Sequence, residues 1–185
     1  ATAGISADQL TRVYVSLAVS LDEQIRALRA AGKNAEADGV SAAFAEFLAQ
    51  ISARQTADAG WPIRNWIAQT YYTMGEDLRT GASPPPAKAK QCFTQARDAY
   101  LALLADAKKD PALAPSPDAL LAVEKQVGEC YRQLGEYKLA LDTFSTVLKD
   151  REAQLSVQQA AAQTYQAWGE VGNPKWLERA IYGGY

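Results

Sequence analysis

The sequence contains no histidine, which removes the commonest general base and the commonest transition-metal ligand from its chemistry. It has only two cysteines, Cys92 and Cys130, and they lack the close spacing of a zinc or redox motif. Zinc, haem and Ser-His or Cys-His catalysis are therefore not expected. The two cysteines could form at most one disulfide. We expect two buried structural thiols instead, because a free cysteine behaves as a small hydrophobe.

Other familiar site patterns are also missing. The stretches "GASPPP" and "YGGY" lack the spacing and the lysine of a phosphate-binding loop. Carboxylates are scattered, so the sequence places no pair of them for acid–base catalysis. The formal net charge is −2, and there is no basic, aromatic stripe of the kind that binds nucleic acid. We therefore expect no enzyme activity, no cofactor, no metal site and no nucleic-acid partner.

Long apolar runs are absent as well, and no signal peptide or basic targeting segment is present. We expect no membrane insertion and leave the compartment open. The chain has 185 residues, of which 48% are hydrophobic and 22% charged, which is typical of a soluble globular chain with one domain. It begins at alanine rather than methionine, which suggests a processed protein or a piece excised from a longer one.

No segment shows the alternating pattern of a strand, whereas apolar residues recur at helical spacing almost throughout. Proline-rich stretches at 79–87 and 110–118 are predicted to be loops within one domain. Ser116 and Pro117 are a good cap and first-turn pair, and Ser6 with Gln9 could form a capping box. We predict eight helices, at about 7–31, 35–54, 62–75, 87–108, 117–134, 137–149, 151–168 and 174–182.

The stretch "VGECYRQLGEYKLALDTFSTVL" at 127–148 carries a more specific pattern. Small and aromatic residues recur in it over two consecutive helices: Gly128, Tyr131, Gly135, Tyr137, Ala140, Phe144 and Val147. This pattern resembles the tetratricopeptide repeat, whose signature includes a Leu-Gly pair, a tyrosine three residues later and Ala-x3-Phe in a second helix. It departs from that signature where Glu124 replaces tryptophan and where no proline follows Leu148.

The pattern recurs along the chain. Tyr165 lies 34 residues after Tyr131, which is the period of the family. Tyr71 lies 60 residues before Tyr131, and it fits the same period if the two proline-rich loops hold insertions of 9 and 17 residues. This alignment matches Gly75 with Gly135. It also matches Ala89 with Ala140 and Phe93 with Phe144. A fainter copy of the pattern lies near the N-terminus, where Leu28, Gly32 and Ala37 match Tyr131, Gly135 and Ala140, respectively.

The resemblance is closest over 120–169, looser over 62–100 and faint at both ends. It implies an all-α fold in which helical hairpins stack into a right-handed superhelix. The chain would be a single helical-repeat domain. Its hairpins would span about 7–54, 62–108, 117–149 and 151–182.

Gly128 lies inside a predicted helix, where glycine costs about 1 kcal/mol relative to alanine. The alignment places Ala68 and Ala162 at equivalent positions. We expect a small residue here because it lets the second helix of the hairpin approach closely, with Ala140 as its small counterpart. Leucine at 128 should then overpack the crossing, and alanine should be tolerated.

In this family the first helix of each hairpin lines a concave face that typically binds peptide segments of other proteins. The resemblance therefore assigns a set of polar, glutamine-rich positions to a groove: Asn65, Gln69, Tyr72, Thr73, Lys125, Gln126, Glu129, Arg132, Gln133, Gln159, Gln163 and Gln166. Amide side chains both donate and accept hydrogen bonds, which suits an extended ligand. For each residue the alternative is an ordinary solvated helix face. Arg132, at such an exposed position, should tolerate charge reversal.

The expected function is a non-catalytic scaffold that binds a peptide or partner-protein segment in its groove. The alternative is a structural spacer or self-assembly module within a larger protein. Four tryptophans could suggest a ligand cage, but we expect them to pack between helices or cap the array: Trp61, Trp66, Trp168 and Trp176.

Overall fold

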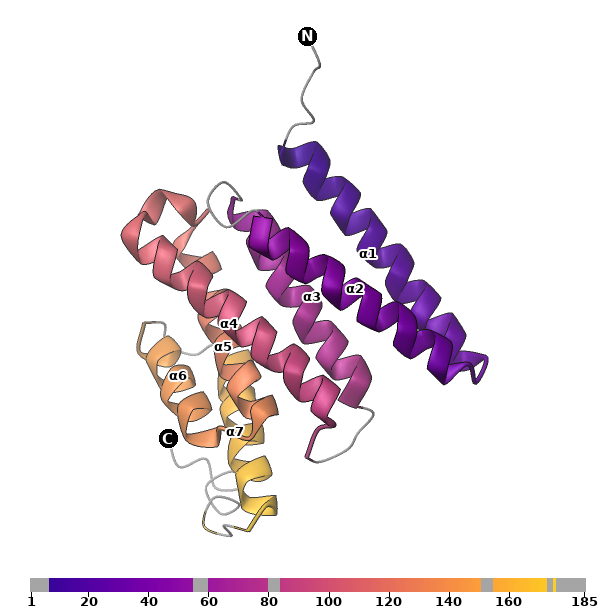
Figure 1. Cartoon of the computed structure of the whole chain (residues 1–185). Coiled ribbons are helices and arrows are strands. Elements are labelled where there is room, and N and C mark those ends of the chain that lie inside the picture. Colours follow the sequence, from indigo (N-terminus) through magenta and orange to yellow (C-terminus); the bar gives the residue numbers. More distant parts are fainter. Residues whose placement is uncertain (1–6, 55–59, 80–83, 151–154, 173–174, 176–185) are drawn as a thin grey trace.

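The computed structural model describes residues 7–54, 60–79, 84–150, 155–172 and 175 of the chain (Figure 1). Within these residues the protein is all-helical and contains no strand, so the predicted all-α class is confirmed. The elements are α1 (Ala7–Ala30), α2 (Asn34–Arg54), α3 (Trp61–Arg79), α4 (Ala87–Lys109), the 3₁₀ helix η1 (Pro111–Leu113), α5 (Pro117–Leu134), α6 (Tyr137–Asp150) and α7 (Leu155–Glu170).

The predicted helix ends agree with the structure at several caps. Ser116 begins α5 as expected, because its Oγ accepts a hydrogen bond from the amide of Ala119 at 3.2 Å and Pro117 follows it. Asp110 caps the 3₁₀ helix through a bond from the amide of Ala112 at 3.1 Å, in a stretch that was predicted to be only a loop. The predicted helix at 174–182 and Ser6 of the capping box lie outside the described residues.

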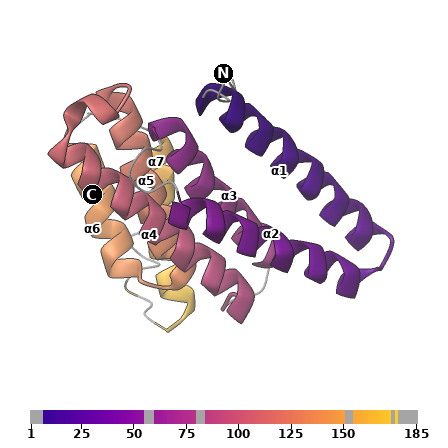
Figure 2. The same ribbon diagram turned by 45° about the horizontal axis from the view of Figure 1, so that its top comes forward.

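Each helix packs against the next one along the chain, most extensively α3 against α4. Alternate helices also touch, since α1 contacts α3 and α5 contacts α7. Figures 1 and 2 show α1 and α2 at one end of the array and α6 and α7 at the other. Compared with the rest, the α1–α2 hairpin meets α3 through few contacts, and Figure 2 shows α1 standing apart from the main body.

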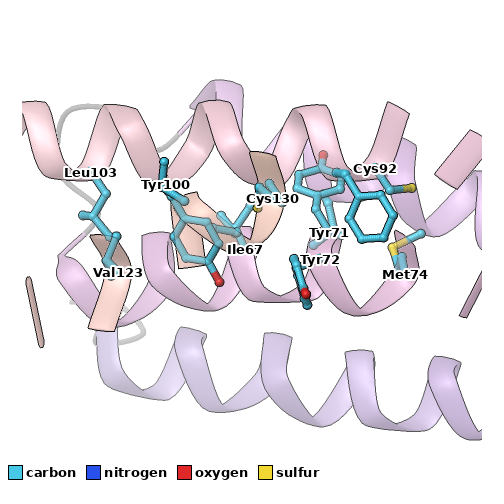
Figure 3. Close-up of a cluster of buried hydrophobic side chains, with 14 of the residues drawn as sticks. Ile67, Tyr71, Tyr72, Met74, Cys92, Tyr100, Leu103, Val123 and Cys130 are labelled. Carbon is cyan, nitrogen blue, oxygen red and sulfur yellow. The ribbon is translucent and has the colours of Figure 1, made fainter. Parts of the chain in front are cut away.

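The core consists of two clusters of buried side chains. The larger one joins α2, α3, α4 and α5, and Figure 3 shows how Tyr71 and Tyr72 of α3 meet Tyr100 of α4 and Cys130 of α5 within it. The smaller one joins α6 and α7 around Phe144, and half-buried Tyr131 packs against both clusters. The buried positions recur at helical spacing along each helix, but the sequence did not predict that Tyr72 is one of them.

Both cysteines are free and buried, which confirms their prediction as structural thiols. Burial raises the pKa of Cys92 and of Cys130, so both thiols stay protonated near neutral pH. Two tryptophans stack on aromatic partners from other helices: Trp66 on Tyr14 with ring centroids 6.5 Å apart, and Trp168 on Tyr137 at 6.0 Å. Trp61 is buried in the larger cluster, and Trp176 lies outside the described residues.

The close approach expected at Gly128 is present. A methyl group built on Gly128 would lie 2.8 Å from Cδ1 and Cζ of Phe144 in α6, well inside van der Waals contact. Gly75 in α3 makes the same kind of contact, because a methyl group there would lie 2.7 Å from Cε1 of Phe93 in α4. In both hairpins a glycine of the first helix therefore receives the phenylalanine ring of the second helix.

This finding corrects the alignment of the two hairpins. The sequence matched Gly75 with Gly135 and ended the third helix near 75, but α3 continues to Arg79. Gly135 has a positive φ of 79° and ends α5, whereas Gly75 is a buried helical residue. The structural counterpart of Gly75 is thus Gly128. In a sequence, a glycine can mark either a helix end or a close helix crossing. Because of this ambiguity, the alignment matched Gly75 with a residue that lies two helical turns after its structural counterpart.

The turns that end α1 and α5 have the same geometry. Gly32 and Gly135 both adopt the left-handed conformation, with φ of 73° and 79°. In each case the glycine amide bonds to the carbonyl three residues earlier, at 3.0 and 3.1 Å, and the next amide bonds to the carbonyl five residues earlier, at 2.9 Å. This is the Schellman motif. The matched alanines Ala37 and Ala140 are both fully buried.

Candidate interaction surface

A cleft of about 220 Å³ lies between α1, α2 and α3, and we call it the α1–α3 cleft. Its rim reaches the surface, since Val19 is exposed and the Asp22 side chain is one-third exposed. Its walls combine apolar side chains with hydroxyl, amide and charged groups: Val19, Asp22, Ile25, Arg29, Ser41, Phe44, Trp66, Gln69, Thr70, Thr73, Met74, Asp77 and Leu78.

The cleft has a local cause in the sequence of α2. Ser41 lies nine residues after the left-handed Gly32, and Phe144 lies nine residues after the left-handed Gly135. A phenylalanine ring thus fills the crossing of α5 and α6, whereas a serine occupies the corresponding place in the α1–α2 hairpin. The space beside Ser41 remains open as part of the cleft.

The floor of the cleft is apolar and firmly built. Phe44 and Ile25 are buried, and Trp66 is held by its stack on Tyr14 of α1. Two polar residues of α3 stand beside this floor. The Gln69 amide oxygen accepts a bond from the Tyr100 hydroxyl at 3.0 Å, which fixes the orientation of its side chain. Thr70 donates its hydroxyl to the carbonyl of Trp66 at 2.8 Å, so its proton is already used within α3.

Charged groups gather where α1 meets the C-terminal part of α3. Arg26 Nη2 pairs with Asp22 Oδ2 at 2.9 Å, and Arg29 Nη1 donates to the backbone carbonyl of Asp77 at 2.9 Å. Burial raises the pKa of Asp77 above its ordinary value of 3.8, and the negative charge of the neighbouring Asp22 carboxylate adds to this rise. The positive charges of Arg26 and Arg29 oppose it.

A second cavity of about 370 Å³ lies on the other side of α3, between α2, α3 and α4. Ser41, Met74 and Leu78 line both spaces. Cys92 contributes its protonated thiol to the second cavity. The α1–α2 hairpin is therefore underpacked on both faces of its contact with α3, which agrees with the small number of contacts between α2 and α3.

Two residues assigned to the groove are buried instead, which corrects the prediction for them. Tyr72 of α3 is 7% exposed and Gln133 of α5 is 6% exposed. The Gln133 amide nitrogen donates to the Tyr72 hydroxyl at 3.4 Å, and its oxygen accepts from Arg79 Nη1 at 2.6 Å. These bonds tie α3 to α5. The sequence missed this role because a buried polar pair has the same composition as a polar surface.

Glu129 and Arg132 are also less exposed than expected. They form an ion pair within α5 at 2.6 Å, and their side chains are only 13% and 17% exposed, respectively. Arg132 donates to the same Glu129 oxygen through Nε at 2.9 Å. Charge reversal at Arg132 would place two carboxylates together at a partly buried site. Arg132 is thus less exposed than the sequence predicted, and we expect this reversal to lower the free energy of unfolding.

The other predicted residues divide between half-buried and exposed positions. Gln69 and Thr73 line the α1–α3 cleft, while Asn65, Lys125 and Gln126 are half-buried outside it. The three predicted glutamines of α7, Gln159, Gln163 and Gln166, are exposed, and Gln166 donates to Glu170 at 2.9 Å. The α1 and α2 walls of the cleft were not predicted. The signal that could have found them is Ser41 at a position where the repeat pattern has a bulky residue.

Comparison with known proteins gives no family for this chain. No protein-family model, curated protein or solved structure matches it. Over the described ranges, no cluster of three or more metal-binding side chains occurs. In that same part of the chain, no helix is long and apolar enough to cross a membrane.

Proposed function

We propose that this chain is a non-catalytic interaction scaffold that holds a segment of a partner protein on the face formed by its first helices. The α1–α3 cleft would be the anchor pocket of that face. We further propose that the hairpins stack as a right-handed superhelix of the tetratricopeptide type. The shared turn at Gly32 and Gly135 supports this arrangement, as does the repeated glycine–phenylalanine crossing in the α3–α4 and α5–α6 hairpins.

One observation carries the proposal: a pocket with an apolar floor lies beside amide and hydroxyl groups of the same helix face. Partner segments are commonly held by one or two bulky side chains that fill such a pocket, with polar contacts around them. The buried walls at Ile25 and Phe44 supply the apolar part. Gln69 and Thr73 supply polar groups at the side of α3 that faces α1.

The test is a selection of random peptides displayed on phage, using the full chain as bait and a cleft-blocked variant for counter-selection. Thr70→Trp blocks the cleft with a large side chain. Thr143→Trp is the matched control, because both threonines are helical and donate to the carbonyl four residues earlier at 2.8 Å. Thr143 lies on α6, toward the other end of the array (Figure 1).

The proposal predicts enriched peptides that share a bulky apolar residue. They should bind the wild type and Thr143→Trp with similar affinity and bind Thr70→Trp at least about tenfold more weakly, a difference of about 1.4 kcal/mol. Circular dichroism would check that both variants keep their helices. Peptides that bind all three proteins equally would exclude the α1–α3 cleft as the site.

The alternative, self-assembly, is favoured by exposed apolar residues on α1. Val13 is 59% exposed and Leu17 is 39% exposed, and both belong to the helix at the end of the array. Such residues often mark contact surfaces. Sedimentation equilibrium over a wide concentration range distinguishes the two functions. Association that disappears in Val13→Lys would favour the self-assembly module, and a monomer at all concentrations would exclude it.

A further inference from the structure

The second cavity, between α2, α3 and α4, has an ion pair at one end and further polar groups toward the other. Lys88 Nζ in the first turn of α4 pairs with Asp38 Oδ2 near the start of α2 at 3.2 Å. Both helices leave this ion pair in the same direction (Figure 1). Glu46, eight residues after Asp38, and Gln95, seven residues after Lys88, therefore both line the cavity about two helical turns farther along.

Glu46 carries the charge that no neighbouring group balances. Asp38 is paired with Lys88, whereas Glu46 forms no ion pair or hydrogen bond with the described residues. Gln91 and Gln95 on α4 also form none within that part of the chain, so their amide groups are available to a ligand. The lining of the cavity thus holds two carboxylates and one ammonium group, and this excess of negative charge favours a positively charged ligand.

The rest of the second cavity is apolar. The Met74 and Cys92 side chains line it and are 8% and 6% exposed, respectively. Figure 3 shows their sulfur atoms at the same end of the buried cluster. A thioether sulfur makes favourable contacts with aromatic rings. The wall on α2 consists largely of small side chains, those of Ala42, Ala45 and Ala49, so the space suits a flat aromatic ring.

We propose that the second cavity binds a small aromatic molecule that carries a protonated amine on a short chain, an arylalkylammonium ion. Its ring packs on Met74 and Cys92, and its ammonium group donates hydrogen bonds to the Glu46 carboxylate and the Gln95 amide oxygen. The volume of about 370 Å³ is sufficient, since a cavity of about 150 Å³ binds benzene. This site lies across α3 from the α1–α3 cleft and does not depend on the function proposed for that cleft.

Three compounds with the same ring and chain test the preference for positive charge. Phenylpropylamine, phenylpropanol and phenylpropanoate end in a cation, a neutral hydroxyl and an anion, respectively. Met74 is the single methionine of the chain, so labelling its methyl group with carbon-13 gives one resonance that reports each titration. The amine should bind at least about threefold more tightly than the alcohol, as expected for an ion pair with an exposed carboxylate, and the alcohol more tightly than the acid.

Substitution of Glu46 tests the assigned ammonium contact. Glu46→Gln should remove the preference for the amine over the alcohol, and Glu46→Lys should make the acid bind more tightly than the amine. Glu36→Lys is the matched control, because Glu36 is also exposed on α2 but does not line the cavity, and it should keep the wild-type order of affinities. A merely structural role for Glu46 would weaken all three compounds without reversing their order.

Blocking variants test where the compounds bind. Ala42 is exposed and lines the second cavity, so Ala42→Trp should abolish the saturable shift of the Met74 resonance. Its neighbour Ala43 is exposed on the same helix but lines neither space, so Ala43→Trp is the control and should bind like the wild type. Thr70→Trp blocks the α1–α3 cleft instead, and it should also bind the amine like the wild type.

Three outcomes would overturn the proposal. The amine could cause no saturable shift of the Met74 resonance, its binding could be lost in Thr70→Trp rather than in Ala42→Trp, or Glu46→Lys could keep the wild-type order of affinities. If Ala42→Trp failed to fold, which circular dichroism would reveal, the reversal in Glu46→Lys would still decide. None of these outcomes excludes a partner segment in the α1–α3 cleft, which keeps its own peptide test.

Discussion

Replacing Gly128 with alanine tests the close helix crossing at its tightest point. The sequence predicts that alanine is tolerated at 128, because the alignment places Ala68 and Ala162 at equivalent positions. The structure gives a different expectation, since the new methyl group would lie 2.8 Å from two ring carbons of Phe144. Phe144 is fully buried, so its ring has no free space into which to move.

Two opposing effects set the size of the change. Alanine improves helix propensity by about 1 kcal/mol relative to glycine. Overpacking a filled core costs about 1–3 kcal/mol, and contact with three atoms of an immobile ring points to the upper part of that range. We therefore expect Gly128→Ala to lower the free energy of unfolding by about 1–2 kcal/mol, despite its better helix propensity.

Gly39 supplies the matched control. It lies inside α2, and a methyl group there would meet nothing within 4 Å. Gly39→Ala should therefore raise the free energy of unfolding by about 0.5–1 kcal/mol. Urea denaturation of both variants measures the difference. If Gly128→Ala were as stabilising as Gly39→Ala, the ring contact would not limit the crossing and the reasoning would be refuted.

Three further changes follow from the packing. Ser41→Leu should raise the free energy of unfolding by about 0.5–2 kcal/mol, because the leucine side chain fills space in the two cavities that Ser41 lines. Calorimetry measures this change, and a lower free energy of unfolding would contradict the prediction. Gln133→Leu should lower the free energy of unfolding, measured in urea, by about 1–3 kcal/mol, because Arg79 loses its hydrogen-bond acceptor. An unchanged free energy of unfolding would show that this hydrogen bond does not stabilise the fold. Burial raises the pKa of the Tyr71 hydroxyl to about 12. The neutral phenol therefore stabilises the folded protein fully below pH 10.0, and this stabilisation is lost as pH rises through 12. Ultraviolet titration should show a late phenolate step that Tyr71→Phe lacks.

Much of the fold could be predicted from local signals. The caps at Ser116 and Gly135 and the apolar faces of α4 and α5 depend on residues within a few positions of each other. The end of α3 could not be predicted in this way. Gly75 has the composition of a helix stop, and only its contact with Phe93 of another helix shows that it belongs inside α3.

The candidate site was harder to predict than the fold. Gln69 and Thr73 were placed on the first-helix face and do line the cleft. Tyr72 and Gln133 were placed there too, but they pair with each other between α3 and α5. Whether a polar helical residue meets solvent or a partner helix depends on the distance between hairpins, which a single sequence does not encode locally. The cleft itself is lined by residues of three helices, α1, α2 and α3, so it depends on their packing as well.

The Met74 methyl resonance offers the most direct test of the central claim that a partner segment binds in the α1–α3 cleft. A peptide obtained by selection on the wild-type chain would be titrated into carbon-13-methyl-labelled protein. Because Met74 lines the cleft, its resonance should shift and saturate in step with binding, both in the wild type and in Thr143→Trp, but not in Thr70→Trp. Saturable binding that leaves this resonance unmoved would contradict the claim and place the binding surface elsewhere.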